Sequence, residues 1–223
     1  MTKYDFTTRP NRLGQNTMKW YSSETDPDLL QMWVADMDFL PLPQVKEALI
    51  AYAQDHVFGY SVVPDSLYQA IIDWERDQHQ YEIRKEDIVL IEGVVPAISL
   101  AIQSLTNEGD AVLINSPVSS PFARTVRLNT RPLVSNSLVE KDGQFTLDFD
   151  QLEADIVEHQ VKLYIFCSPH NPGGRVWTKE EVEKVGLLCQ KHGVILISDE
   201  IHQDMALFGH KHFSFNTVSP DFK

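Results

Sequence analysis

The sequence predicts an α/β protein in which a mainly parallel sheet carries helices on both faces. Short apolar runs alternate with amphipathic stretches along most of the chain, and acidic or glycine residues stand at the turns between them. Uninterrupted apolar runs of this length indicate buried strands, and their alternation with helices indicates a parallel sheet. The expected strands are residues 87–91, 111–115, 131–138, 161–168 and 194–200.

The helices are predicted from apolar residues that recur at helical spacing. The sharpest boundaries belong to one helix, where Thr178 and Glu181 form a capping box and Gly193 ends the pattern. Asp65 and Asp148 are the expected N-caps of two others. The expected helices are residues 44–55, 65–80, 94–105, 120–129, 148–158 and 178–193.

The first 43 residues lack this alternation. They are polar up to the stretch MWVADMDFLPLP, whose prolines, aspartates and aromatic residues indicate an extended, anchored segment. We therefore divide the chain into an N-terminal segment, residues 1–43, and a larger domain, residues 44–223.

Composition limits the classes of partner. Nineteen basic residues against 32 acidic ones give a net charge of −13, which disfavours nucleic acid and anionic membranes as partners. No apolar run approaches the roughly 18 residues of a membrane span, and the polar N-terminus does not resemble a signal peptide. Cys167 and Cys189 are too few for a disulfide framework, so we expect a reducing, cytoplasmic setting.

Ligands of such sheets bind at the carboxyl ends of the strands, which selects the loops after residues 91, 115, 168 and 200. Three of these loops carry candidate chemistry. In the first, Gly93 permits a tight turn, and Val94 and Val95 would present backbone amides at a helix N-terminus. Pro96 sits in the first turn, where a missing N–H costs little. This loop is either an ordinary strand-to-helix turn or a phosphate site.

The other two loops carry polar side chains. Asn171, held before Pro172 in CSPHNPGG, either bonds a ligand or caps its own turn. Asp199 ends an apolar strand and His202 follows, so the pair is a base with its orienting partner, a metal site or a salt-bridged strand end.

Three other classes of chemistry lack their motifs. FGHKHF contains two histidines but no zinc-ligand spacing accompanies them, so we expect no metal. The chain has no G-x-S-x-G elbow of a serine hydrolase and no G-x-G-x-x-G of a dinucleotide dehydrogenase.

Taken together, the loops resemble the fold-type-I pyridoxal-phosphate enzymes of the class I/II aminotransferase superfamily. The closer resemblance is to the C–S β-lyase branch, which includes cystathionine β-lyases and cysteine-S-conjugate β-lyases. The stretches that carry it, in order along nearly the whole chain, are MWVADMDF, FGY, GVVPAISLAI, SPHNPGGRVW and SDEIHQDM.

The resemblance implies a role for each matching residue on the cofactor pyridoxal 5'-phosphate. Asn171 would bond the phenolic oxygen, Asp199 would pair with the ring nitrogen, and His202 stands where many relatives have a tyrosine. The amides around Gly93, Val94 and Val95 would hold the phosphate.

The resemblance also implies a homodimer. Tyr60 would reach the phosphate bound by the neighbouring subunit, so the family's active sites are formed by two chains. Residues 1–43 would belong to the small domain, and residues 44–223 would be an incomplete cofactor-binding domain.

Three departures from the family pattern accompany these matches. The Schiff-base lysine that attaches the cofactor is missing, because Lys211 and Lys223 follow Asp199 in the wrong context. The C-terminal part with the arginine that binds the substrate carboxylate is also absent, and we expect Arg175 to be a surface or structural residue. Ser119 stands where an aromatic residue would stack on the cofactor.

The resulting hypothesis is an N-terminal fragment of a C–S β-lyase that is inactive by itself. The full-length enzyme would convert cystathionine or another cysteine S-conjugate into a thiol, pyruvate and ammonia. Two alternatives stay open: an aminotransferase, which shares every quoted loop, and a non-catalytic binding remnant, which the missing lysine favours.

Overall fold

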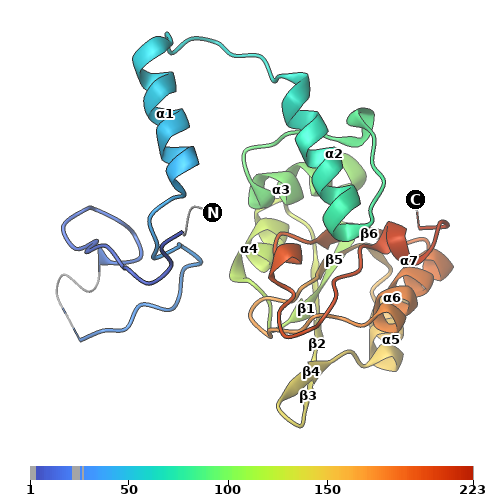
Figure 1. Cartoon of the computed structure of the whole chain (residues 1–223). Coiled ribbons are helices and arrows are strands. Elements are labelled where there is room, and N and C mark those ends of the chain that lie inside the picture. The colour runs from blue at the N-terminus through green and yellow to red at the C-terminus, as the bar shows by residue number, and fades with distance from the viewer. Residues whose placement is uncertain (1–3, 22–25, 27, 223) are drawn as a thin grey trace. The chain divides into compact units, whose positions relative to one another are not determined.

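The computed structural model describes residues 4–21, 26 and 28–222. Contacts within the chain divide it into two compact units, Met1–Val62 and Val63–Lys223 (Figure 1). The assignment of residues 1–43 and 44–223 to the two domains of the family stays a prediction. Within the described ranges, every helix is too short or too polar to cross a membrane.

The first unit contains helix α1 (Pro43–Asp55) and an irregular segment held by ion pairs. Lys19 is only 5% exposed, and its Nζ donates to the Asp36 carbonyl at 2.7 Å and to Asp38 Oδ2 at 2.9 Å. Arg12 pairs with Asp36 at 2.7 Å. The stretch that was expected to be extended and anchored is thus fixed mainly by these charged side chains.

The second unit contains a four-stranded parallel sheet with the order β2-β1-β5-β6, which confirms the predicted fold class (Figure 1). All three neighbouring pairs run parallel. Four of the five expected strands form it: β1 (Ala111–Ser116), β2 (Leu133–Ser137), β5 (Val161–Cys167) and β6 (Ile195–Asp199).

Helices cover both faces of this sheet, as predicted. Successive residues of β1 alternate between two apolar clusters, with Val112 and Ile114 in one and Leu113 in the other. The first cluster includes α3 (Val94–Leu105) and α4 (Ser120–Leu128). The second includes α5 (Phe149–Glu158), α6 (Lys179–His192) and α7 (Phe215–Val218).

The helix caps follow the sequence closely, with one correction. Thr178 and Glu181 form the expected capping box of α6, and Gly193 ends that helix at φ +64°. Asp148 caps α5 by accepting from the Gln151 amide at 3.0 Å. Asp65 is not an N-cap, because α2 (Asp65–His79) already includes it and Pro64 precedes the helix.

The expected strand at residues 87–91 is wrong. The segment begins at the end of a short 3₁₀ helix, η2 (Lys85–Asp87), and then stays unpaired. Val89 is 78% exposed and Leu90 is 43% exposed. A strand needs a neighbour for its backbone groups, and no described strand lies beside this run.

Several short elements were not predicted, among them η2, α7, a hairpin and a second 3₁₀ helix. A hairpin of β3 (Val139–Lys141) and β4 (Gln144–Thr146) turns at Asp142 and Gly143, which have φ values of +53° and +76°. An Asp-Gly pair is a strong hairpin signal, so the sequence did contain this information. A short 3₁₀ helix, η3 (Gln203–Met205), follows β6.

Candidate active site

The carboxyl ends of β1, β5 and β6 bring three of the selected loops together. Cys167 and Asp199 are register partners at the ends of β5 and β6, and the Ser168 amide donates to the Asp199 carbonyl at 2.9 Å. The loop after β1 joins them, because the Ser119 amide donates to the Asn171 carbonyl at 3.0 Å. The predicted residues Asn171 and Asp199 therefore share one edge of the sheet.

Asp199 is a buried carboxylate with an incomplete set of partners. Its residue exposure is 9%, and Oδ1 accepts one bond, from the Ile201 amide at 3.2 Å. Burial raises the pKa of this carboxyl, while the Ile201 bond and the charge of His202 act in the opposite direction. Among the described residues no donor contacts Oδ2, so the carboxylate can still accept a cationic group.

Asn171 keeps its side chain free. Its backbone amide contacts Cys167 Sγ at 3.4 Å, whereas its exposed side-chain amide bonds no described residue. Cys167 itself is a core residue, and burial raises the pKa of its thiol to about 11. At neutral pH that thiol is protonated, which excludes it as a ready nucleophile.

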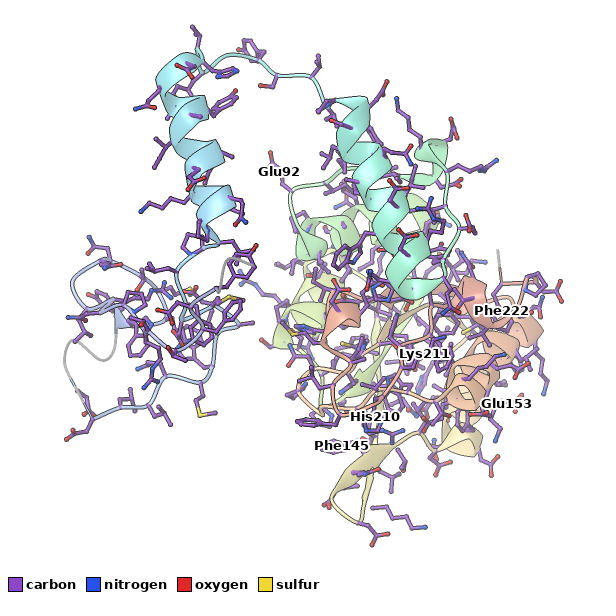
Figure 2. All side chains as sticks on the ribbon, in the orientation of Figure 1. Glu92, Phe145, Glu153, His210, Lys211 and Phe222 are labelled. Carbon is purple, nitrogen blue, oxygen red and sulfur yellow. The ribbon has the colours of Figure 1, made fainter. Side chains whose placement is uncertain are left out.

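The N-terminus of α3 offers two free amides rather than three. Gly93 has φ +113°, a conformation that favours glycine, and its own amide donates to the Ile91 carbonyl at 2.8 Å. Within the described chain no acceptor meets the amides of Val94 and Val95. Glu92 is exposed, and its side chain points away from the start of α3 (Figure 2).

The remaining predicted residues differ in how far the structure places them. His202 is partly buried and precedes η3, three residues after Asp199. Tyr60 belongs to the first compact unit and is fully exposed there. Its role at a neighbouring subunit's phosphate stays a prediction.

These features fit pyridoxal phosphate. A buried carboxylate that no described cation contacts suits a protonated ring nitrogen, the side-chain amide of Asn171 suits the phenolic oxygen, and two helix-terminal amides suit a phosphate. One element is missing: Ser119 provides no aromatic ring at the position expected to stack on the cofactor.

Lys211 lies away from these groups. Its Nζ is 3.3 Å from Gln80 Oε1 and 5.4 Å from the centre of the Phe213 ring (Figure 2). The side chain is thus directed to the end of α2 and to its own segment, in agreement with the view that its sequence context is not that of a cofactor-attaching lysine.

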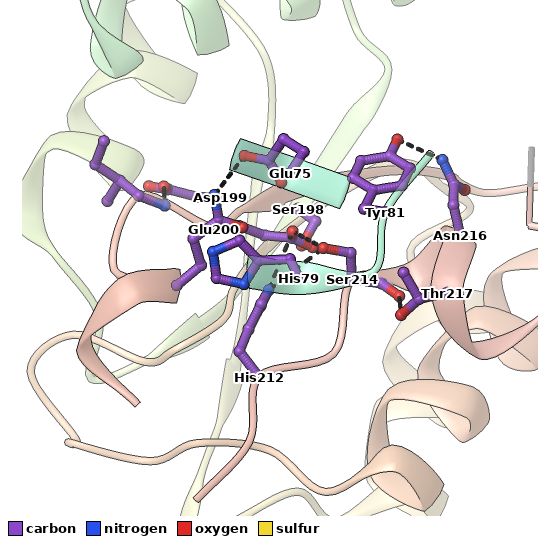
Figure 3. A network of polar contacts seen from close by, with 12 residues as sticks. Glu75, His79, Tyr81, Ser198, Asp199, Glu200, His212, Ser214, Asn216 and Thr217 are labelled. Atoms are coloured by element: carbon purple, nitrogen blue, oxygen red, sulfur yellow. Dashed lines mark hydrogen bonds and ion pairs between the residues drawn. The ribbon is translucent and has the colours of Figure 1, made fainter. Parts of the chain in front are cut away.

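A polar network beside Asp199 was missed by the sequence analysis (Figure 3). The Glu200 carboxylate accepts from Ser198 Oγ at 2.7 Å and from Ser214 Oγ at 2.5 Å, and it contacts His212 Nε2 at 3.2 Å. This set arises from the strand end and a segment 12 to 14 residues later. The described residues contain no cluster of three or more His, Cys, Asp or Glu side chains suited to a metal ion.

The fold and the site define a class of protein, and comparison with known proteins agrees with it. The family model for aminotransferase class I and II matches residues 27–221, so the chain belongs to that family. It is 41% identical over 221 residues to the cystathionine beta-lyase PatB of Bacillus subtilis, covering 98% of this chain and 57% of PatB.

Two solved structures are also similar to this chain in fold and sequence. Cystalysin from Treponema denticola, which contains a pyridoxal 5'-phosphate cofactor, is 35% identical with a TM-score of 0.92, over 99% of this chain and 57% of its own. The pyridoxal-phosphate-bound C–S lyase from Staphylococcus hominis is 31% identical with a TM-score of 0.91, over 98% and 56%. The chain therefore spans somewhat more than half the length of these relatives.

Proposed function

We propose that this chain forms the cofactor-binding part of a pyridoxal-phosphate-dependent carbon–sulfur β-lyase. The reaction would take cystathionine or another cysteine S-conjugate and one water, and would release a thiol, pyruvate and ammonia. The observation that carries the proposal is the buried, incompletely partnered carboxylate of Asp199 beside the loop of Asn171. The similarity to PatB and to the two lyase structures supports a lyase within the family.

Each residue of the site would have a defined task. Pyridoxal phosphate, when bound, supplies an electron sink for the substrate α-carbon. Asp199 would keep a proton on the ring nitrogen, because a carboxylate within hydrogen-bond reach raises the pKa of that nitrogen. Asn171 would donate to the phenolic oxygen, and His202 would contact the same oxygen. The amides of Val94 and Val95 would donate to the phosphate.

Ser119 would weaken cofactor binding without preventing it. An aromatic residue at this position would stack on the ring, and such stacking contributes about 0.5–1.5 kcal/mol beyond burial. The Ser119 amide still holds the Asn171 carbonyl, so the backbone of the site does not depend on a ring there.

The active enzyme would be a cytoplasmic homodimer. Tyr60 would contact the phosphate in the neighbouring subunit, and its full exposure within its own unit supports this role. The free, buried thiols of Cys167 and Cys189 support a reducing compartment.

An aminotransferase is the second candidate, because the matching family model describes that class. Both activities need the same groups around the cofactor. The products separate them: thiol and pyruvate identify a lyase, whereas a keto acid with the amino group transferred to an acceptor identifies an aminotransferase.

A chimera would test the proposal. The 223 residues would be joined to the part of PatB that they do not cover, loaded with pyridoxal phosphate, and given cystathionine. We expect stoichiometric thiol and pyruvate, and strong loss of both in the matched Asp199→Ala chimera. A folded, cofactor-loaded chimera that transfers the amino group instead would establish the aminotransferase; one that does neither would contradict both.

The 223-residue polypeptide by itself should bind pyridoxal phosphate but not turn over cystathionine. Lys211 and Lys223 are its only lysines after Asp199, and neither has the expected context. Pyruvate release near the rate of the chimera would contradict this expectation.

A further inference from the structure

We propose that Arg175 is a positioning residue, which locks the loop of residues 168–175 and thereby fixes Asn171. The inference rests on the proposed function, because only there does Asn171 contact the cofactor. Arg175 itself would touch neither cofactor nor substrate; it would act through the loop.

The guanidinium of Arg175 is held on three sides. Nη2 bonds both carboxylate oxygens of Glu181, at 2.8 and 2.7 Å, and Nη1 donates to the Phe145 carbonyl. The guanidinium carbon of Arg175 lies 4.6 Å from the centre of the Trp177 ring. The side chain is 14% exposed, so this ion pair is far more shielded than a surface pair. The hairpin, the start of α6 and the loop just before α6 thus converge on one side chain.

Backbone contacts transmit this position to Asn171. The His170 amide donates to the Arg175 carbonyl at 2.7 Å, and the Gly174 amide donates back to the His170 carbonyl at 2.9 Å. Trp177 Nε1 donates to the Cys167 carbonyl at 2.9 Å. Asn171 lies inside the loop that these bonds close, so a shift of Arg175 would move it.

The loop interior leaves little freedom. The Gly173 amide donates to His170 Nδ1 at 3.2 Å, which requires a neutral imidazole. A Cβ on Gly173 would lie 2.7 Å from the same nitrogen and 2.9 Å from the Phe145 ring. Burial and the charge of Arg175 keep His170 neutral, by lowering its pKa to about 4. Arg175 therefore supports the loop by its bonds and by its charge.

The test combines two measurements on the 223-residue chain. Amide hydrogen exchange at Gly174 reports the loop without any cofactor, and titration with pyridoxal phosphate reports the proposed site. We expect Arg175→Gln to accelerate Gly174 exchange about tenfold or more and to weaken cofactor binding severalfold. Arg175→Lys keeps the charge but loses the planar set of donors that reaches both Glu181 and the Phe145 carbonyl. Its effects on Gly174 exchange and on cofactor binding should therefore be smaller than those of Arg175→Gln.

Two controls separate positioning from general stability. Arg84 also bonds a carboxylate twice, at Asp87, but its side chain is 77% exposed; Arg84→Gln should change neither measurement. Val126→Ala should destabilise the fold without a selective effect on Gly174, because Val126 is a fully buried residue of the apolar cluster on the other face of the sheet.

Each result of these measurements either supports or overturns the role of Arg175. Unchanged Gly174 exchange in Arg175→Gln, or faster exchange with unchanged cofactor affinity, would overturn the inference. If Arg175→Gln does not fold, Glu181→Gln and Arg175→Lys provide the same comparison. If the unaltered chain binds no pyridoxal phosphate, the proposed function fails, while Gly174 exchange still decides whether Arg175 holds the loop.

Discussion

Two segments of the candidate site, residues 168–177 after β5 and residues 88–95 around the start of α3, differ in what holds them. The first is packed: His170 is 4% exposed and Trp177 is 1% exposed, and two backbone hydrogen bonds join His170 to Gly174 and Arg175. In the second, Val89 is 78% and Leu90 43% exposed, and no described strand pairs with them. The loop after β5 is thus held in place by its own side chains, whereas the segment around the start of α3 is not.

The difference shows which kinds of structure a local sequence can make alone. The loop after β5 stays in place because Arg175, Glu181 and Trp177 stand close together in the chain and in space. The run at residues 88–91 has the composition of a strand, yet backbone donors and acceptors form a strand only beside another one. Apolar composition without a neighbour leaves an exposed, extended segment.

The largest expected effect follows from removing the Trp177 ring from the packed segment. Trp177→Ala removes a ring that contacts Phe166 and His170 and whose Nε1 bonds the Cys167 carbonyl. It should lower the free energy of unfolding by about 3–5 kcal/mol, measured by urea denaturation. Trp177→Phe, which keeps most of the ring, should cost less. A loss below about 1 kcal/mol for Trp177→Ala would mean that the segment is not held by its packing.

Acid should weaken the packed segment next. The pKa of His170 is lowered to about 4, so the unfolded chain, near the ordinary value of 6.5, binds the proton first. The stability contribution is therefore complete above about pH 6.5 and declines as pH falls towards 4, by at most about 1.4 kcal/mol for each pH unit. Unfolding measured against pH should show a flatter acid limb in His170→Gln; identical limbs would contradict the assignment.

Asp199 should show the opposite sign. Burial raises its pKa, so the folded chain holds this proton more tightly than the unfolded chain, and stability falls as pH rises past the ordinary value of aspartate. Asp199→Asn should leave the free chain equally or more stable at neutral pH, with the difference shrinking in acid. The same variant should weaken pyridoxal phosphate binding about tenfold or more, which is about 1.4 kcal/mol. Loss of stability with unchanged binding would mean that the carboxylate is structural.

The parts predicted correctly from sequence are those set by neighbours in the chain. The capping box of Thr178 and Glu181 was predictable because four consecutive residues contain both of its side chains. The strands β1, β5 and β6 followed from short, mostly apolar runs, whereas β2 (LVSNS) has alternating buried and exposed residues. Asn171 and Asp199 were selected because strand ends in this class face one edge, and the register of Cys167 with Asp199 agrees.

The parts that were missed depend on distant partners. The strand at residues 87–91 failed because pairing is a property of the whole sheet. The bond from Arg175 to the Phe145 carbonyl could not be derived, since Phe145 lies 30 residues away in sequence. The bonds of Glu200 to Ser214 and His212 were not predicted for the same reason, although a carboxylate that follows a buried strand needs donors. The hairpin at Asp142 and Gly143, by contrast, was predictable from its Asp-Gly pair.

The smallest expected effect sharpens the contrast between the two segments. Leu90 is 43% exposed, whereas Leu163, in the middle of β5, is 0% exposed. Leu90→Ala should therefore change the free energy of unfolding by no more than about 0.5 kcal/mol, while Leu163→Ala should cost about 2–5 kcal/mol. The amides of residues 89–91 should also exchange far faster than those of β5, because no described strand protects them. A loss of more than about 1 kcal/mol in the free energy of unfolding for Leu90→Ala, together with slow exchange, would show that this run is packed and paired in solution. The two segments of the site would then be held equally firmly.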